Sequence, residues 1–316
     1  MKCVVTGGAG FIGSTLVDRL LAEGHAVDVV DNLVSGNLAN LAGARGDRSH
    51  DFTFHQIDIC SDGVIELIER RQPDVVYHLA AQADVRRSIA DPAFDARVNV
   101  LGGINVLEGA RRAGADKVVF ASSGGTIYGE PDPTDLPVTE AMPLNPLSPY
   151  GITKRVFSDY LNAYRELYQL EFTSLALGNV YGPRQDPHGE AGVVSIFAAK
   201  LLAGQPCTIF GTGEQTRDFV FVDDVVDAFV RASTKGGGLL MNIGTSREVS
   251  VIELYESMAK AAGVADPPIY APARLGELDR ISLDATRAKI QLGWESWTQL
   301  DVGTRAVIDW ERTKHV

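Results

Sequence analysis

Two side chains one helical turn apart have the types and the spacing for acid–base chemistry. Tyr150 and Lys154 stand in the segment Tyr-Gly-Ile-Thr-Lys, at the start of a predicted helix over residues 150–168, so they face the same side of that helix. A tyrosine ordinarily titrates near pH 10, but a neighbouring ammonium group favours the phenolate and lowers its pKa. The pair therefore predicts a base that takes a proton from an alcohol, although such a spacing is more often a solvated helix face.

Hydroxyl groups follow a predicted strand just before this helix. The strand covers residues 117–122, and the next residues supply Ser122, Ser123 and Thr126 in Ser-Ser-Gly-Gly-Thr. A hydroxyl at this strand end could hydrogen-bond the reacting oxygen and relay its proton. Ser123 and Thr126 are both candidates, and Thr126 could instead cap its own turn.

A glycine-rich turn near the N-terminus predicts the binding of a dinucleotide. Gly7, Gly10 and Gly13 lie between an apolar strand and a helical pattern that begins at Phe11. The spacing allows a tight turn, close approach of a pyrophosphate, and phosphate binding at the helix N-terminus. The next predicted strand ends at Asp31, whose carboxylate could accept hydrogen bonds from ribose hydroxyls and would repel a 2′-phosphate, so NAD is favoured over NADP. The alternative is an α/β domain whose glycine-rich turn binds nothing.

Further polar and small residues follow other predicted strands. Asp58 ends a strand over residues 52–57, where it could meet an adenine amino group or cap the next helix. Ala80 and Ala81 follow a strand over residues 74–79 and would allow a cofactor to approach closely. Asn99 is unfavourable in the middle of a predicted helix over residues 92–113, which indicates a buried hydrogen-bonding role.

The alternation of these elements predicts an α/β fold with a doubly wound parallel sheet. Strands and helices alternate up to residue 177, a rhythm typical of right-handed crossovers, and ligands then bind at the carboxyl ends of the strands. Beyond Tyr181 the predicted elements are shorter. We therefore expect a cofactor-binding domain over residues 1–180 and a smaller α/β substrate domain over residues 181–316.

The net charge, the apolar stretches and the cysteine spacing exclude several classes of function. The formal charge of −12 over 316 residues argues against a nucleic acid or an anionic membrane as partner. We find no apolar stretch long enough to span a bilayer and no signal-peptide pattern. Cys3, Cys60 and Cys207 are scattered, so we expect reduced thiols, a cytoplasmic protein and no metal site.

The motifs together resemble a known family. The GxxGxxG spacing in TGGAGFIGS resembles the extended short-chain dehydrogenases/reductases, whose cofactor domain has the Rossmann fold. The segments DNLVSG, HLAAQADV, SSGGTIYG, SPYGITK, GNVYGPRQ, TRDFVFVDDVVDA and RLGE extend the likeness to nearly the whole chain. Within the family they resemble the UDP-glucose/UDP-galactose 4-epimerases and their UDP-N-acetylhexosamine-using relatives, especially the actinobacterial ones with a DPHGEAGVVSIF loop. The resemblance implies a tightly held NAD, oxidation at the sugar C4 hydroxyl, and return of the same hydride to the opposite face.

This resemblance also implies roles for individual residues. Many epimerases have their working serine at the position of Gly124, so Ser123 and Thr126 are the replacements expected here. Arg217 and Arg274 suit a diphosphate, with salt bridges as the alternative. Ile281 replaces a bulky tyrosine that excludes N-acetyl groups, and we expect it to leave room for them. The helices over residues 99–113 and 150–168 imply a homodimer.

The predicted catalytic residues are Tyr150, Lys154, Ser123 and Thr126. The predicted cofactor-binding residues are Gly7, Gly10, Phe11, Ile12, Gly13, Asp31, Asn32, Ser35, Gly36, Asp58, Ile59, Leu79, Ala80, Ala81, Gln82, Asn99, Ser122, Tyr150 and Lys154. The predicted substrate-binding residues are Ser123, Thr126, Tyr150, Asn179, Val194, Phe197, Thr208, Ile209, Phe210, Arg217, Arg274, Glu277 and Ile281.

Three other functions remain open at this point. A nucleotide-sugar 4,6-dehydratase would need an acid pair after the strand-end hydroxyl, where this chain has Gly-Gly-Thr-Ile. A UDP-glucuronate epimerase or decarboxylase is a closer competitor. A binding protein without catalysis would have no reason to keep both Tyr150 and Lys154.

Overall fold

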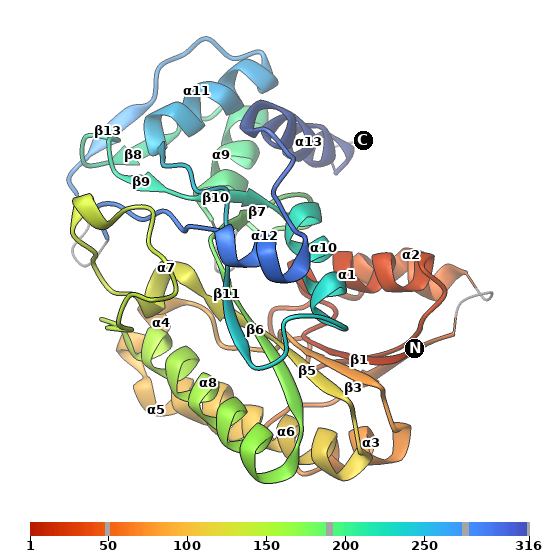
Figure 1. The fold of residues 1–316 in the computed structure, drawn as a ribbon. Coiled ribbons are helices and arrows are strands. Elements are labelled where there is room, and N and C mark those ends of the chain that lie inside the picture. Colours follow the sequence, from red (N-terminus) through yellow and green to blue (C-terminus); the bar gives the residue numbers. More distant parts are fainter. Residues whose placement is uncertain (48–50, 188–191, 274–277, 315–316) are drawn as a thin grey trace.

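A seven-stranded parallel sheet forms the centre of the molecule (Figure 1). The computed structural model describes residues 1–47, 51–187, 192–273 and 278–314. The strands lie in the order β11-β6-β5-β4-β1-β2-β3, and every neighbouring pair is parallel. Their bounds are β1 Lys2–Thr6, β2 Ala26–Asp31, β3 Phe52–Gln56, β4 Val75–His78, β5 Lys117–Ser123, β6 Glu171–Leu177 and β11 Leu239–Ile243. The predicted doubly wound parallel sheet is confirmed, and its order reverses between β1 and β4, where such folds bind ligands.

Helices cover both faces of this sheet. On one face lie α1 (Phe11–Ala22) and α10 (Val222–Ala232), and on the other lie α3 (Gly63–Arg71), α6 (Gly103–Ala113) and α8 (Pro149–Tyr168). Cys3 and Val5 of β1 pack into the first core, whereas Val4 packs into the second. Because successive strand residues point to opposite faces and both faces are covered, Cys3, Val4 and Val5 are all apolar and buried.

The central sheet takes its last strand from the C-terminal part of the chain. β11 pairs with β6, and α10 packs beside α1. The sheet therefore includes a strand from beyond residue 181, where we expected the second domain to begin. The division into residues 1–180 and 181–316 stays a prediction.

Short elements make up the rest of the C-terminal part, which lies beyond one end of the sheet in Figure 1. Three two-stranded pairs occur there, β7 with β10, β8 with β13, and β9 with β12. Their bounds are β7 Asn179–Tyr181, β8 Thr208–Phe210, β9 Thr216–Arg217, β10 Phe219–Phe221, β12 Val249–Ser250 and β13 Ile269–Ala271. The helices are α9 Val193–Leu202, α11 Val251–Ala262, α12 Thr286–Leu292 and α13 Leu300–Thr313.

The helix predicted over residues 92–113 is present with those bounds, but its interior is π-helical rather than α-helical. The structure has α5 (Pro92–Ala96), a π-helical segment η2 (Arg97–Gly102) and then α6. π-Helical turns cost regular hydrogen bonding and occur often at functional sites. Asn99 lies inside this segment, where its side chain is buried in a polar network. The remaining short elements are η1 Leu38–Leu41, α2 Ala42–Gly46, α4 Val85–Ala90, α7 Gly124–Ile127 and η3 Pro133–Asp135.

The described residues lack a membrane-spanning helix and a metal-binding cluster. No helix in this part of the chain is long and apolar enough to cross a bilayer. The same residues contain no group of three or more histidine, cysteine or acidic side chains placed to hold a metal ion. Cys3, Cys60 and Cys207 are free thiols.

Candidate active site

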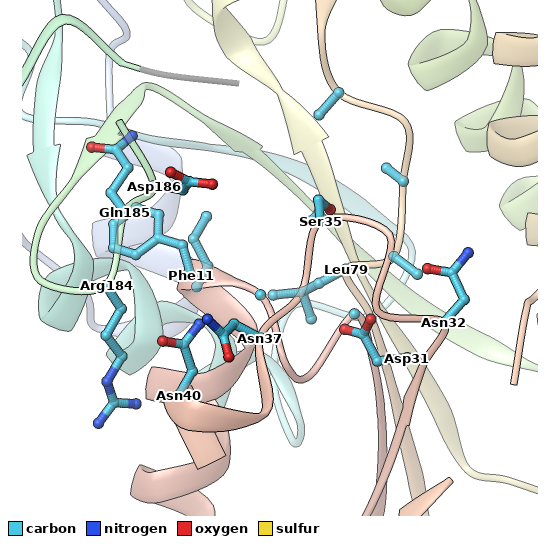
Figure 2. Close-up of a pocket in the computed structure, with 18 of the residues that line it drawn as sticks. Phe11, Asp31, Asn32, Ser35, Asn37, Asn40, Leu79, Arg184, Gln185 and Asp186 are labelled. Carbon is cyan, nitrogen blue, oxygen red and sulfur yellow. The ribbon is translucent and has the colours of Figure 1, made fainter. Parts of the chain in front are cut away.

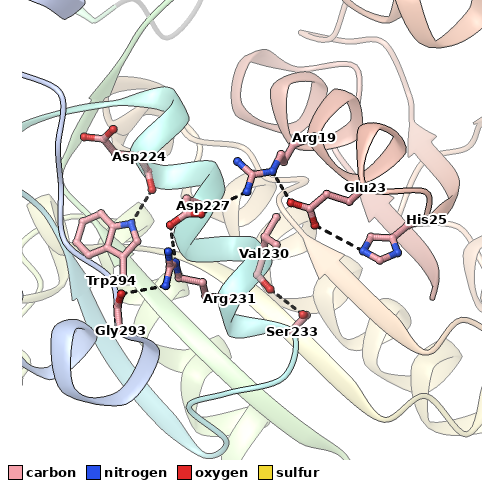
Figure 3. A network of polar contacts seen from close by, with 10 residues as sticks. All are labelled: Arg19, Glu23, His25, Asp224, Asp227, Val230, Arg231, Ser233, Gly293 and Trp294. Atoms are coloured by element: carbon pink, nitrogen blue, oxygen red, sulfur yellow. Dashed lines mark hydrogen bonds and ion pairs between the residues drawn. The ribbon is translucent and has the colours of Figure 1, made fainter.

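A cavity of about 640 Å³ lies at the carboxyl ends of the central strands (Figure 2). The glycine turn after β1, the ends of β2, β4 and β5, and the start of α8 all contribute to its wall. Sixteen predicted cofactor residues line it: Gly7, Gly10, Phe11, Ile12, Gly13, Asp31, Asn32, Ser35, Asp58, Ile59, Leu79, Ala80, Ala81, Ser122, Tyr150 and Lys154. The structure thus brings together residues that lie up to 147 positions apart in the sequence.

The glycine turn leaves no room for side chains. Gly7 has a φ of 71°, and a Cβ built on it would lie 2.7 Å from the backbone nitrogen of Ala80. A Cβ on Gly13 would lie 2.2 Å from the backbone oxygen of Gly7. Gly10 precedes α1 without a side-chain cap, so the first N–H groups of the helix face the cavity. Such an uncapped helix start binds phosphates well.

The Asp31 carboxylate is held rigidly at the end of β2. It accepts hydrogen bonds from the backbone N–H groups of Ala9 (3.0 Å) and Leu33 (2.8 Å), and only 8% of the residue is exposed. Burial raises the pKa of Asp31, and the two N–H groups oppose that shift. Gly36 lies behind the carboxylate, because a Cβ there would be 2.7 Å from Oδ1 of Asp31. Gly36 therefore supports the pocket rather than lining it.

Asp58 lies at the cavity wall, and the N-cap residue of α3 is Asp62, so the predicted contact with an adenine amino group stays a prediction. Its carboxylate lines the cavity and accepts from the Asn32 amide at 3.0 Å. It also accepts from the backbone N–H of Cys60 at 2.8 Å, in the turn that leads into α3. These hydrogen bonds lower the pKa of Asp58 despite its partial burial.

Lys154 lies beneath Tyr150 on one face of α8. Its ammonium group lies 5.6 Å from the centroid of the Tyr150 ring and 4.8 Å from that of Phe120. It donates to the backbone oxygen of Ala121 at 2.9 Å, and Lys154 is 3% exposed. Tyr150 remains partly exposed at the cavity wall. The spacing of four residues thus places a buried cation beside a tyrosine that a ligand can reach.

Asn99 and Gln82 support this arrangement from behind. The Asn99 side chain accepts from the backbone N–H of Gln82 (2.8 Å) and donates to the backbone oxygen of the same residue (2.8 Å). It also donates to Asp95 (3.1 Å) and to Thr153 (3.2 Å), the residue before Lys154. Neither Asn99 nor Gln82 is among the residues that line the cavity, and both belong to a buried network beside the lysine; their predicted contacts with a cofactor stay predictions.

The strand-end hydroxyls differ in their surroundings. Ser122 lines the cavity, and its Oγ is buried without a hydrogen-bond partner. The Thr126 hydroxyl donates to the backbone oxygen of Ser123 over 3.5 Å, a long bond. Ser123 and Thr126 are both partly exposed. They stay the two candidates for the proton relay.

The predicted substrate residues are distributed over the wall and the core. Asn179 opens β7, where its backbone N–H donates to the oxygen of Asp218 at 2.7 Å. The Arg217 guanidinium is half-buried and donates to the backbone oxygens of Thr216 (2.7 Å) and Asp279 (3.3 Å). Thr208 and Phe210 are half-buried. Arg274 and Glu277 lie outside the described residues.

Four of the expected substrate contacts are fully packed. Val194, Phe197 and Ile209 have exposed fractions of 1% or less and belong to the main hydrophobic core. Ile281 is 2% exposed and packs with Ile127, Tyr128, Val138, Ala176 and Leu283. These side chains lie behind any substrate surface in this structure, and their contacts with a substrate stay predictions.

Sequence reasoning missed a whole side of the cavity. The further lining residues include Asn37, Ala39, Asn40, Arg184, Gln185, Asp186, Pro187, Trp310 and Lys314. The first three continue the loop after Asp31 and could have been found from it. Trp310 and Lys314 come from the far end of the chain and carry no sequence signal for this position.

Comparisons with known proteins agree with this geometry. A model of the NAD-dependent epimerase/dehydratase family matches residues 3–244. The chain belongs to this family. It is 51% identical over 315 residues to UDP-glucose 4-epimerase of Mycolicibacterium smegmatis, covering 99% of both chains.

Two solved structures extend the comparison. The chain is similar to UDP-glucose 4-epimerase of Thermotoga maritima with UDP-glucose, with a TM-score of 0.95, 42% identity and full coverage of both chains. It is also similar to UDP-glucose 4-epimerase of Thermus thermophilus in complex with NAD, with a TM-score of 0.91, 41% identity and 99% coverage of both.

NAD is the cofactor of this family, and the cavity fits it. The glycine turn forms a cradle that any Cβ would fill, and the uncapped start of α1 faces the cavity. Asp31 presents a carboxylate suited to ribose hydroxyls, and Ser122 offers a buried hydroxyl without a partner. These features match the phosphates, ribose and ring of a dinucleotide.

Proposed function

We propose that the protein interconverts UDP-galactose and UDP-glucose with Tyr150 as the base. The protein is an NAD-dependent isomerase that inverts C4 of UDP-hexoses through a transient 4-keto sugar. The observation that carries the assignment is the position of Tyr150 and Lys154 in one wall of a dinucleotide cavity. The similarity to UDP-glucose 4-epimerases over the full chain supports it.

Tyr150 accepts and returns the proton of the C4 hydroxyl. NAD, when bound, supplies a hydride acceptor that returns the hydride to the sugar. The phenol oxygen takes the proton from the C4 hydroxyl, and gives it back when the opposite epimer forms. Lys154 favours the phenolate through its charge, since its ammonium group is buried 5.6 Å from the ring centroid. The same ammonium group also suits the ribose next to the nicotinamide.

A strand-end hydroxyl completes the proton path. Ser123 or Thr126 hydrogen-bonds the C4 oxygen and relays its proton to Tyr150. Ser123 ends β5 and Thr126 lies in α7, and a Cβ on the intervening Gly125 would lie 3.7 Å from Asn179 Oδ1. The closeness of this turn to Asn179 supports the assignment of a strand-end hydroxyl to the substrate side of the site.

Cationic side chains anchor the diphosphate of the substrate. The guanidinium groups of Arg217 and Arg274 carry paired N–H donors that suit phosphate oxygens. Because the formal charge of the chain is −12, an anionic ligand has to be held by such local cations. Asn179, Thr208, Phe210 and Glu277 contact the nucleotide, with Val194, Phe197, Ile209 and Ile281 packed behind this surface. The bound nucleotide holds the sugar while the 4-keto group turns, so no net redox change results.

Two related activities are less well supported. A 4,6-dehydratase removes water across C5 and C6, and the strand-end segment Gly124–Ile127 offers no carboxylate for that step. A UDP-glucuronate epimerase or decarboxylase remains the alternative.

The assembly and setting of the enzyme are further parts of this proposal. Leu101, Ile152, Leu167 and Tyr168 lie on η2 and α8 with exposed fractions between 48% and 70%. We expect these apolar side chains to pair across a two-fold axis in a homodimer. Light scattering should give twice the chain mass of 34.0 kDa, and a monomer would contradict the dimer. The enzyme acts in the cytoplasm, in galactose metabolism.

A substrate assay tests the function. The purified protein is incubated with UDP-galactose, and nuclear magnetic resonance follows the appearance of UDP-glucose. We expect interconversion without loss of carbon dioxide or water from the sugar. Turnover of UDP-glucuronate alone would favour the alternative. UDP-N-acetylgalactosamine as a further substrate tests the role of Ile281, and no activity on it would contradict the expected room for an N-acetyl group.

A further inference from the structure

The cofactor cavity has a second wall from the C-terminal part of the chain. Arg184 and Gln185 follow β7, and Trp310 lies in the last turn of α13, yet all three line the same cavity as the glycine turn. In the view of Figure 2, Arg184 and Gln185 appear on the same side of the cavity as Phe11 and Asn40, opposite Asp31 and Asn32.

Unpartnered polar atoms gather at this wall. Within the described residues, six buried side-chain nitrogen or oxygen atoms have no hydrogen-bond partner. Four of these belong to residues that line the cavity: Ser122 Oγ, Arg184 Nη1, Gln185 Oε1 and Trp310 Nε1. Buried polar atoms are nearly always paired, because an unpaired one costs its full desolvation free energy. Their concentration here indicates that a ligand supplies the missing partners.

Contacts with α1 hold this wall in place. Arg184 donates from Nη2 to Asp18 of α1 at 2.6 Å, which leaves Nη1 for another acceptor. Gly182 lies against Phe11, the first residue of α1, because a Cβ on it would be 3.5 Å from Cε2 of that ring. The wall is therefore tied to the helix whose N-terminus is suited to phosphates.

We propose that Arg184, Gln185 and Trp310 contact the ADP half of bound NAD and retain the cofactor. Arg184 Nη1 and Trp310 Nε1 are donors only, so they suit phosphate or ribose oxygens, whereas Gln185 Oε1 accepts from a hydroxyl. The ADP half is favoured because the wall touches α1, while Tyr150 and Lys154 mark the nicotinamide end on α8. This inference rests on the proposed function in placing NAD in this cavity.

Cofactor affinity tests the inference without any turnover. The protein is stripped of nucleotide, and its Kd for NAD and for ADP is measured by calorimetry in the variants Arg184→Met and Trp310→Phe. We expect at least a fivefold rise in Kd for both nucleotides in each variant, and a faster release of NAD. Arg19→Met is the matched control, because Arg19 also joins α1 to the C-terminal part through Asp227 (3.5 Å) but does not line the cavity.

Each other outcome has a defined meaning. Binding of NAD within twofold of the parent protein in both variants would overturn the inference, as would weaker binding of NAD with unchanged binding of ADP. Asp31→Ala separates the two proposals. If it weakens NAD binding while the wall variants do not, only the wall fails, and if it too has no effect, the placement of NAD fails. Thermal unfolding of the stripped variants checks folding, and Trp310→Phe keeps an aromatic ring in the wall.

Discussion

Gly124 lies so close to Leu283 that a Cβ built on the glycine would be 2.4 Å from Cδ1 of the leucine. Leu283 is fully buried, and its backbone N–H donates to the Asp218 carboxylate at 3.1 Å. A side chain at position 124 therefore requires Leu283 to move. This close contact fits the proposal that the working hydroxyl comes from a neighbouring position, Ser123 or Thr126.

Gly124→Ser should lower stability and leave the rate of epimerisation no higher than before. Overpacking of a filled core costs about 1–3 kcal/mol, which urea unfolding will measure. Gly125→Ser is the matched control, since the nearest atom to a Cβ there is Asn179 Oδ1 at 3.7 Å. Equal stability of the two variants would show that Leu283 moves aside freely.

Asp31 should decide between NAD and NADP. Its carboxylate is fixed by the N–H groups of Ala9 and Leu33, so it cannot turn away from a 2′-phosphate. We expect the parent protein to bind NAD at least 100-fold more tightly than NADP, about 2.7 kcal/mol, and Asp31→Ser to reduce that ratio. Calorimetry on the stripped protein measures both nucleotides. An unchanged ratio in the variant would mean that another group sets the preference.

His78 should make the protein less stable as the pH falls below neutrality. Burial, and then the charge of Lys154, lower the pKa of His78 to about 3. In the unfolded chain this histidine takes up a proton near pH 6.5. Between these two pKa values the unfolded state therefore binds more protons than the folded state, and the free energy of unfolding decreases as the pH decreases. From pH 7.5 to 5.5 the loss from this residue should be about 1.4 kcal/mol.

Urea unfolding of His78→Asn at the two pH values checks this expectation. The asparagine cannot titrate but can still hydrogen-bond the Thr6 hydroxyl, which lies 2.8 Å from Nδ1 of the histidine. The variant should be less stable at pH 7.5 and lose less stability on acidification. The same loss in both proteins would refute the assignment to His78.

The elements that the sequence predicted well are those whose signals are local. β1, α1 and β2 follow from an apolar strand, three glycines and a helical period. The pairing of β11 with β6 was not predicted, because the two strands lie more than 60 residues apart in the sequence. The π-helical segment around Asn99 depends on contacts with Gln82 and Thr153, which no helical period reveals.

The same distinction applies to the site. Tyr150 and Lys154 are one helical turn apart, and the glycine turn has the spacing that lets a phosphate approach. The structure places all of them in one cavity. Arg184 and Trp310 reach that cavity only through the packing of the C-terminal part against α1. Their side chains have no neighbouring motif, so tertiary structure is needed to find them.

The most direct test of the mechanism is the rate of conversion of UDP-galactose to UDP-glucose by Tyr150→Phe. The variant keeps the ring near Lys154 and loses only the phenol oxygen, so its fold and its NAD content should match the parent protein. The proposed mechanism predicts a rate lower by about 10²–10⁴-fold in a protein that still holds NAD. Conversion at the parent rate would contradict the role of Tyr150 as the base.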